Sequence, residues 1–207
     1  MSAENNCKFA CFSGQALLRH GSLAEVATAA KARLEEGSEE GLAIFSDETG
    51  RPVDLDLRGS LDDVLRRLAR RAEADGAEAA SPAPTRSGPG RPKLGVVSKE
   101  VTLLPRHWDW LGRQPGGASA TLRRLVEEAR RSSGPADAAR RSQEAAYRFM
   151  SAMAGDLAGF EEATRAFFAH DFDRFQTLID PWPRDVRDHV RRLAAIAAED
   201  LAKATRP

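Results

Sequence analysis

The sequence predicts an α+β fold with four parts in chain order: an N-terminal tandem ββα domain (8–71), a flexible linker (72–95), a central strand–helix–helix unit (96–132) and a C-terminal α-helical bundle (136–205). Three observations predict this arrangement. Short apolar runs alternate with helical apolar spacing in the first third, Ala, Gly, Pro and Ser dominate the next stretch, and helical spacing continues through the last third. An apolar fraction of 42% is enough to build hydrophobic cores.

The N-terminal domain is predicted from a pattern that occurs twice. In each copy an apolar run ends in Phe-Ser, a turn and a second extended run follow, and Gly-Ser-Leu leads into a helical pattern. Ser22 and Ser60 are predicted helix N-caps, because Glu25 and Asp63 follow at the spacing of reciprocal capping partners. The alternation in residues 53–57 (VDLDL) predicts an antiparallel strand with one face in water. Each copy is therefore interpreted as a hairpin followed by a helix.

Several side chains of metal-ligand type are interpreted as structural. Asp47 and Glu48 fall in a predicted turn, and His20 is interpreted as a surface turn residue. Asp185 and His189 lie four apart on a predicted helix, a spacing that is common for pairs on the solvent side. Since no nucleophile–base arrangement or phosphate loop occurs, we expect no catalytic residue, no metal, no cofactor and no enzymatic activity.

The linker is predicted from its composition. Residues 72–95 show no apolar periodicity, so they cannot bury enough surface to offset the entropy of ordering. The linker ends in a basic arm that contains Arg86 and the sequence Gly90-Arg91-Pro92-Lys93. Gly-Arg-Pro beside basic residues resembles the AT-hook, and the resemblance implies that Arg86, Arg91 and Lys93 contact DNA in a narrow minor groove. An ordinary proline-rich linker is the alternative.

Charge is segregated along the chain although the formal net charge is zero. Residues 82–135 hold 10 basic and 4 acidic residues, or +6, whereas residues 1–81 hold 10 basic and 15 acidic residues, or −5. Phosphate binding depends on local positive charge, so a nucleic acid is expected at the middle segment. The alternative is that the acidic residues of 1–81 neutralise this segment within the same chain.

The central unit is predicted from a β-prone run over 96–104, a short helix over 106–114 and a second helix capped by Ser119. A Pro-Gly-Gly sequence at 115–117 separates the two helices. One strand with two helices has too little core to fold alone, and the strand has an unpaired edge. Because a second copy would supply both the pairing strand and the missing core, we expect a homodimer through residues 96–132.

This order of strand, helix, glycine turn and helix resembles the ribbon-helix-helix DNA-binding proteins. The resemblance implies a two-stranded ribbon in the major groove and phosphate held at the start of the second helix. The residues implied to contact DNA are Ser98, Lys99, Glu100, Thr102, Ser119 and Arg123. Glu100 departs from the basic or neutral polar residues that are usual in family ribbons. The sequence therefore predicts a homodimeric protein that binds double-stranded DNA, such as a transcriptional regulator. The alternative is a dimeric protein-interaction or scaffold protein that binds no DNA.

The C-terminal bundle is predicted from three apolar stripes at helical spacing. The second stripe, from Phe160 to Ile179, is expected to bend near Asp171. A Pro-Trp-Pro sequence at 181–183 is expected to end it, since proline cannot continue a helix.

The chain as a whole also resembles an uncharacterised bacterial group, the domain-of-unknown-function family 2239. The matching segments are 49–59 (TGRPVDLDLRG), 90–97 (GRPKLGVV), 101–108 (VTLLPRHW) and 147–156 (YRFMSAMAGD). This resemblance implies no activity. The first residues lack a basic start followed by an apolar run, and no apolar stretch has a membrane-spanning length. We therefore expect a cytoplasmic protein with no membrane partner.

Overall fold

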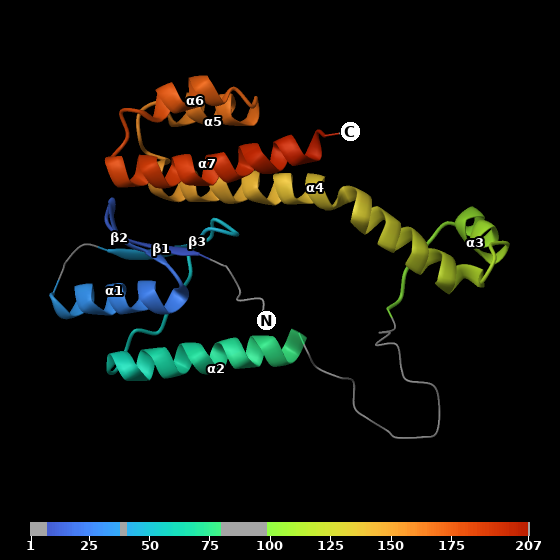
Figure 1. Ribbon diagram of the computed structural model, residues 1–207, viewed down its shortest axis with the longest axis horizontal. Coiled ribbons are helices and arrows are strands. Elements are labelled where there is room, and N and C mark those ends of the chain that lie inside the picture. Colours follow the sequence, from blue (N-terminus) through green and yellow to red (C-terminus); the bar gives the residue numbers. More distant parts are fainter. Residues whose placement is uncertain (1–7, 38–40, 80–98, 207) are drawn as a thin grey trace. The chain divides into compact units, whose positions relative to one another are not determined.

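The computed structural model describes residues 8–37, 41–79 and 99–206, and it is a mixed, mostly helical α+β structure (Figure 1). The described elements are β1 (Phe9–Ser13), β2 (Ala16–Gly21), α1 (Leu23–Glu35), β3 (Leu42–Ser46), α2 (Leu61–Ala79), α3 (Pro105–Gly112), α4 (Gly117–Ala154), α5 (Phe160–Phe168), α6 (Phe172–Ile179) and α7 (Arg184–Ala204). The chain divides into two compact units. Unit 1 comprises Met1–Ala69 and Gly134–Pro207, and unit 2 is the intervening Arg70–Ser133.

The sheet of unit 1 is antiparallel and has the order β2-β1-β3. A two-residue turn joins β1 to β2, and Gly14 occupies it with a φ of 55°, a conformation that glycine adopts without strain. Ala10 of the central strand pairs with His20 on one side and with Phe45 on the other. These three residues therefore form one row across the sheet. The His20 side chain consequently points to the same face as Ala10 and Phe45.

The two faces of this sheet bury different partners, as Figure 1 shows for α1 on one face and for α4 and α7 on the other. Cys11 and Ile44 point to α1 and form a small core with Val26. Ala10 and Phe45 point the other way and belong to a larger core that includes side chains of α4, α5, α6 and α7. The first and last thirds of the chain therefore share one hydrophobic core.

Local signals of the N-terminal part are confirmed. Ser22 and Glu25 form a reciprocal capping box at the start of α1. Ser60 and Asp63 exchange the same pair of backbone-to-side-chain hydrogen bonds, at 3.0 and 3.2 Å, before α2. At each site, two hydrogen bonds between residues three apart satisfy backbone amides that the start of a helix leaves unpaired. Because the partners are so close in sequence, their spacing alone predicts the cap.

The predicted strand over 53–57 is not formed. Its side chains alternate as expected, with Val53, Leu55 and Leu57 against the α1 core, but its only recorded bridge in the described residues joins Phe45 to Pro52. Two backbone hydrogen bonds make this bridge: the Ser46 amide donates to the Arg51 carbonyl at 3.1 Å, and the Val53 amide donates to the Ile44 carbonyl at 2.7 Å. The segment is extended without being a regular strand.

The boundary between the predicted central unit (96–132) and the predicted C-terminal bundle (136–205) lies inside one helix, because α4 runs from Gly117 to Ala154 with Pro135 inside it. Proline removes one helical hydrogen bond and crowds the carbonyl four residues before it. Pairs at helical spacing flank the proline on both sides, such as Arg131 with Glu127 and Arg140 with Asp137. Such pairs each stabilise a helix by about 0.2–0.5 kcal/mol, which helps it to continue past the proline.

The predicted bend near Asp171 is present, since α5 ends at Phe168 and Asp171 caps α6 by accepting from the Arg174 amide. The Pro-Trp-Pro sequence separates α6 from α7, and Trp182 is buried there with its indole N–H donated to the Ala158 carbonyl at 3.1 Å. Among the described helices, none combines the length and apolar character needed to cross a membrane.

Candidate functional site

The structure brings His20, Asp47 and His189 together in unit 1, and we call these residues the His–Asp–His cluster. His20 lies near the end of β2 in the row of Ala10 and Phe45, which faces α7. Asp47 directly follows β3, and its amide donates to the Lys8 carbonyl at 2.9 Å, which fixes the turn beside β1. His189 lies on α7 and is buried against the sheet. Three elements from both ends of the chain thus supply one side chain each.

Asp47 stands between the two imidazoles. Its Oδ2 lies 2.7 Å from His20 Nε2, and its Oδ1 lies 3.3 Å from His189 Nε2. The side chains are 18% exposed for His20, 10% for Asp47 and 0% for His189. Within the described residues, Asp47 Oδ1 and His189 Nε2 have no aligned hydrogen bond. Buried polar atoms are rarely left in this state, so this pair is a functional candidate.

The partner of the other ring nitrogen assigns the proton of His189. Arg192 Nη1 lies 3.1 Å from His189 Nδ1, and a guanidinium can only donate. Nδ1 is therefore the acceptor, and Nε2 carries the ring proton toward Asp47. Burial alone would raise the pKa of Asp47, but the His189 and His20 imidazoles lower it by more, so its pKa lies below the usual range. Asp47 is thus an ionised carboxylate that orients both rings.

The variant Asp47→Asn is expected to lose about 2–4 kcal/mol of unfolding free energy at pH 7, since it removes the charge that both imidazoles face. The pKa of Asp47 is lowered in the folded state, so its contribution is present above the ordinary aspartate pKa near 3.9 and disappears as the pH falls through the folded pKa. The difference between the two proteins should therefore shrink below about pH 4. Urea unfolding at pH 7 and pH 3 in metal-free buffer measures it.

Asp54→Asn is the control, because Asp54 is exposed on the extended segment and should change stability by less than about 0.5 kcal/mol. An Asp47→Asn loss that stays constant down to pH 3 would contradict the assignment of an ionised Asp47.

The residues predicted to contact DNA are only partly within the described structure. Arg86, Arg91, Lys93 and Ser98 lie outside the described residues. Lys99, Glu100 and Thr102 are exposed in a segment that forms no strand within this chain. The predicted N-cap role of Ser119 is wrong, because α4 already begins at Gly117, where positive φ values at Gly116 and Gly117 end the preceding turn. Arg123 is exposed one turn later, and its Nε donates to the Ser119 carbonyl at 3.1 Å.

The described part of unit 2 exposes many large apolar side chains. Between residues 99 and 133, the buried residues are Leu111 and Thr121 alone. Large apolar residues with relative exposures of 43–63% are Val101, Leu104, Trp108, Trp110 and Val126. Within the described residues, this segment therefore has little hydrophobic core of its own.

The family described as "Uncharacterized protein conserved in bacteria (DUF2239)" matches residues 8–194. The chain belongs to this family. The match includes the His–Asp–His cluster as well as the central unit, and the family description assigns neither of them an activity. No curated protein and no solved structure matches the chain.

The His–Asp–His cluster was missed by the sequence analysis, in which His20 and Asp47 were interpreted as turn residues. His189 was paired with Asp185 on a solvent face, but His189 is buried, and Asp185 Oδ2 accepts from the Leu17 amide at 2.9 Å. The helical spacing of apolar residues did contain one signal that His189 is buried. His189 lies next to Val190 and between Val186 and Leu193, all of which are buried, so it falls within the apolar stripe of α7.

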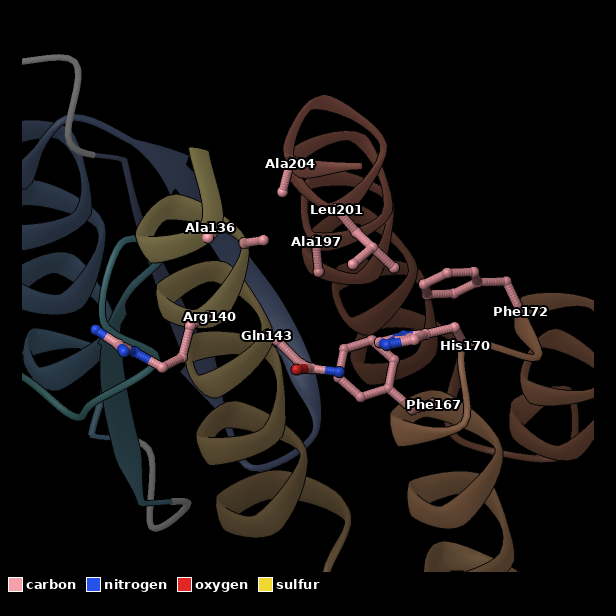
Figure 2. Close-up of a pocket in the computed structure, with 10 residues that line it drawn as sticks. Ala136, Arg140, Gln143, Phe167, His170, Phe172, Ala197, Leu201 and Ala204 are labelled. Carbon is pink, nitrogen blue, oxygen red and sulfur yellow. The ribbon is translucent and has the colours of Figure 1, made fainter. Parts of the chain in front are cut away.

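A pocket of about 230 Å³ lies between α4, α7 and the junction of α5 with α6 (Figure 2). Figure 2 shows the Gln143 side chain pointing toward the Phe167 ring, while Arg140 points away from it. Apolar side chains such as Phe172 and Leu201 form much of the remaining wall. The pocket thus offers few convergent polar groups, and we assign it no ligand.

Proposed function

We propose that the chain is a homodimeric DNA-binding protein, such as a transcriptional regulator, which pairs through residues 96–132. The observation that carries the proposal is the exposed apolar surface of the described central unit, from Val101 to Val126. Leu104, Trp108 and Val126 have the exposure expected of a half-core that a second copy completes. Pairing of the β-prone runs would also cover the strand edge of each copy.

Charge supports DNA as the ligand of this dimer. Within the described residues, Arg106, Arg113 and Arg123 form no ion pair, whereas Arg124, Arg130 and Arg131 each have a glutamate neighbour on α4. Cations without an acidic partner remain available to phosphate. The first turn of α4 adds the positive end of a helix dipole near Arg123. A dimer presents each of these groups twice.

Glu100 supports the alternative, a dimeric scaffold that binds no DNA. It is exposed in the segment that should form the ribbon, where a carboxylate repels phosphate. It can also accept a hydrogen bond from cytosine N4, so it does not decide between the two functions.

Titration of a fluorescent duplex at low salt tests the proposal. We expect nanomolar to micromolar binding that weakens steeply with salt, since each neutralised phosphate adds about 0.9 to the log–log slope. Arg91→Ala and Arg123→Ala should each weaken binding and reduce the slope. Arg184→Ala is the control, because Arg184 is exposed at the start of α7 in unit 1.

Light scattering on the same samples separates the alternatives. We expect twice the chain mass of 22.5 kDa, and Trp108→Glu should shift the protein toward the single mass. A dimer without binding at tens of micromolar protein would favour the scaffold. A monomeric mass at that concentration would contradict both functions.

A further inference from the structure

We propose that the His–Asp–His cluster binds one divalent transition-metal ion of the zinc type, through His20 Nε2, a carboxylate oxygen of Asp47 and His189 Nε2. Two imidazole nitrogens and one carboxylate are donors that suit zinc and its neighbours in the first transition row. Three protein ligands leave a fourth position open for water or another ligand. This inference is independent of the DNA-binding proposal, since all three residues belong to unit 1.

The distances fit such an ion. With metal–ligand distances of about 2.0–2.1 Å, neighbouring ligands of a tetrahedral ion lie about 3.3 Å apart. His189 Nε2 and Asp47 Oδ1 are already 3.3 Å apart, and the ligand atoms of all three residues lie within 4.8 Å of one another. His20 Nε2 is nearer to the carboxylate, at 2.7 Å from Oδ2. It is the most exposed ligand, so its ring has room to withdraw as an ion enters.

The two atoms without an aligned hydrogen bond point to the same ion. In the described structure, Asp47 Oδ1 and His189 Nε2 are buried next to each other, and neither forms an aligned bond. A cation between them would coordinate both atoms directly. Among the described residues this is the only group of three such ligands, so the expected stoichiometry is one ion per chain.

Aromatic packing holds the buried imidazole in place. The His189 ring meets Phe149 edge-on at 4.5 Å between centroids and Phe12 at 5.7 Å. Asp47 is held by the hydrogen bond from its backbone amide to the Lys8 carbonyl and by the tight turn that follows β3. A ligand set whose geometry is fixed by its surroundings loses little conformational freedom when an ion binds.

Arg192 opposes the ion in a way that can be measured. Binding through Nε2 requires the His189 proton to move to Nδ1, where Arg192 now donates at 3.1 Å. The guanidinium must therefore withdraw, which Arg192 can do because the residue is exposed on α7. Removing this side chain should strengthen metal binding, an effect that an adventitious surface site would not show.

The test is calorimetric titration of chelator-treated full-length protein with Zn²⁺, with Co²⁺ absorption as a second probe of tetrahedral coordination. We expect one ion per chain and an increase in Tm on Zn²⁺ addition. His20→Ala should weaken binding at least about 10-fold and abolish the Tm increase, and Arg192→Ala should tighten binding several-fold. His107→Ala is the matched control, because His107 is exposed in unit 2. Absence of saturable binding, or equal affinities for the His20 and His107 variants, would overturn the proposal.

Discussion

Gly50→Ala is expected to destabilise the protein by at least about 4 kcal/mol. Gly50 has a φ of 65°, and a Cβ built there would lie 1.9 Å from the Ala145 carbonyl oxygen of α4. The obstructing atoms belong to helix backbone, so the turn or the helix must move. The same turn carries Asp47, and Arg148 of α4 donates to its Thr49 carbonyl at 3.1 Å. Its displacement would therefore also disturb the His–Asp–His cluster.

Gly37→Ala is the matched control for Gly50→Ala, because Gly37 has a similar φ of 74° but, among the described residues other than its chain neighbours, no atom lies within 4 Å of its added Cβ. It should show only the backbone cost of about 1–2 kcal/mol. Urea unfolding of both variants measures the difference. Equal losses would mean that close contact with α4 contributes nothing at Gly50.

Phe149→Ala is expected to cost about 3–5 kcal/mol, the range for removing a large buried aromatic side chain. Phe149 is completely buried, and its ring contacts Phe45 at 5.0 Å and Phe12 at 5.5 Å between centroids. One helical side chain thus joins the helices of unit 1 to the sheet. Phe168→Ala is the control, since Phe168 is 44% exposed and should lose far less.

Hydrogen exchange distinguishes a shared core from two separate ones. In Phe149→Ala the free energy of opening should fall for amides of β1 and of α7 together, because both elements belong to one core. If β1 keeps its wild-type protection while α7 loses it, the sheet and the helices open as independent units. That result would contradict the shared core.

Structural features that depend only on residues three or four positions apart could be predicted from the sequence. The capping boxes at Ser22 and Ser60 depend on one side chain and one amide in the same turn, so spacing identifies them. The end of α6 and the start of α7 follow from prolines 181 and 183, whose rings cannot continue a helix. Pro135 is the counter-example, since stable helix on both sides overrides the local cost of proline.

Features that depend on distant partners could not be predicted from one sequence. The apolar residues of β1 are buried on both faces, but periodicity does not say that Phe12 packs against Phe149 rather than against α1. Likewise, His20, Asp47 and His189 share no sequence spacing that indicates a site. They meet because the order β2-β1-β3 and the position of α7 bring three unrelated segments to one face of the sheet.

The bond between Leu17 and Asp185 has a consequence for synthesis on the ribosome. These partners are 168 positions apart. At a translation rate of about 5–20 residues per second, the nascent β1–β2 hairpin waits roughly 10–30 s before α7 has been made. During that interval the helices that cover Phe12 have not yet been made, so the nascent chain exposes apolar surface that can aggregate. The face of the hairpin that carries Phe12 is therefore covered only after the C-terminal helices have been made.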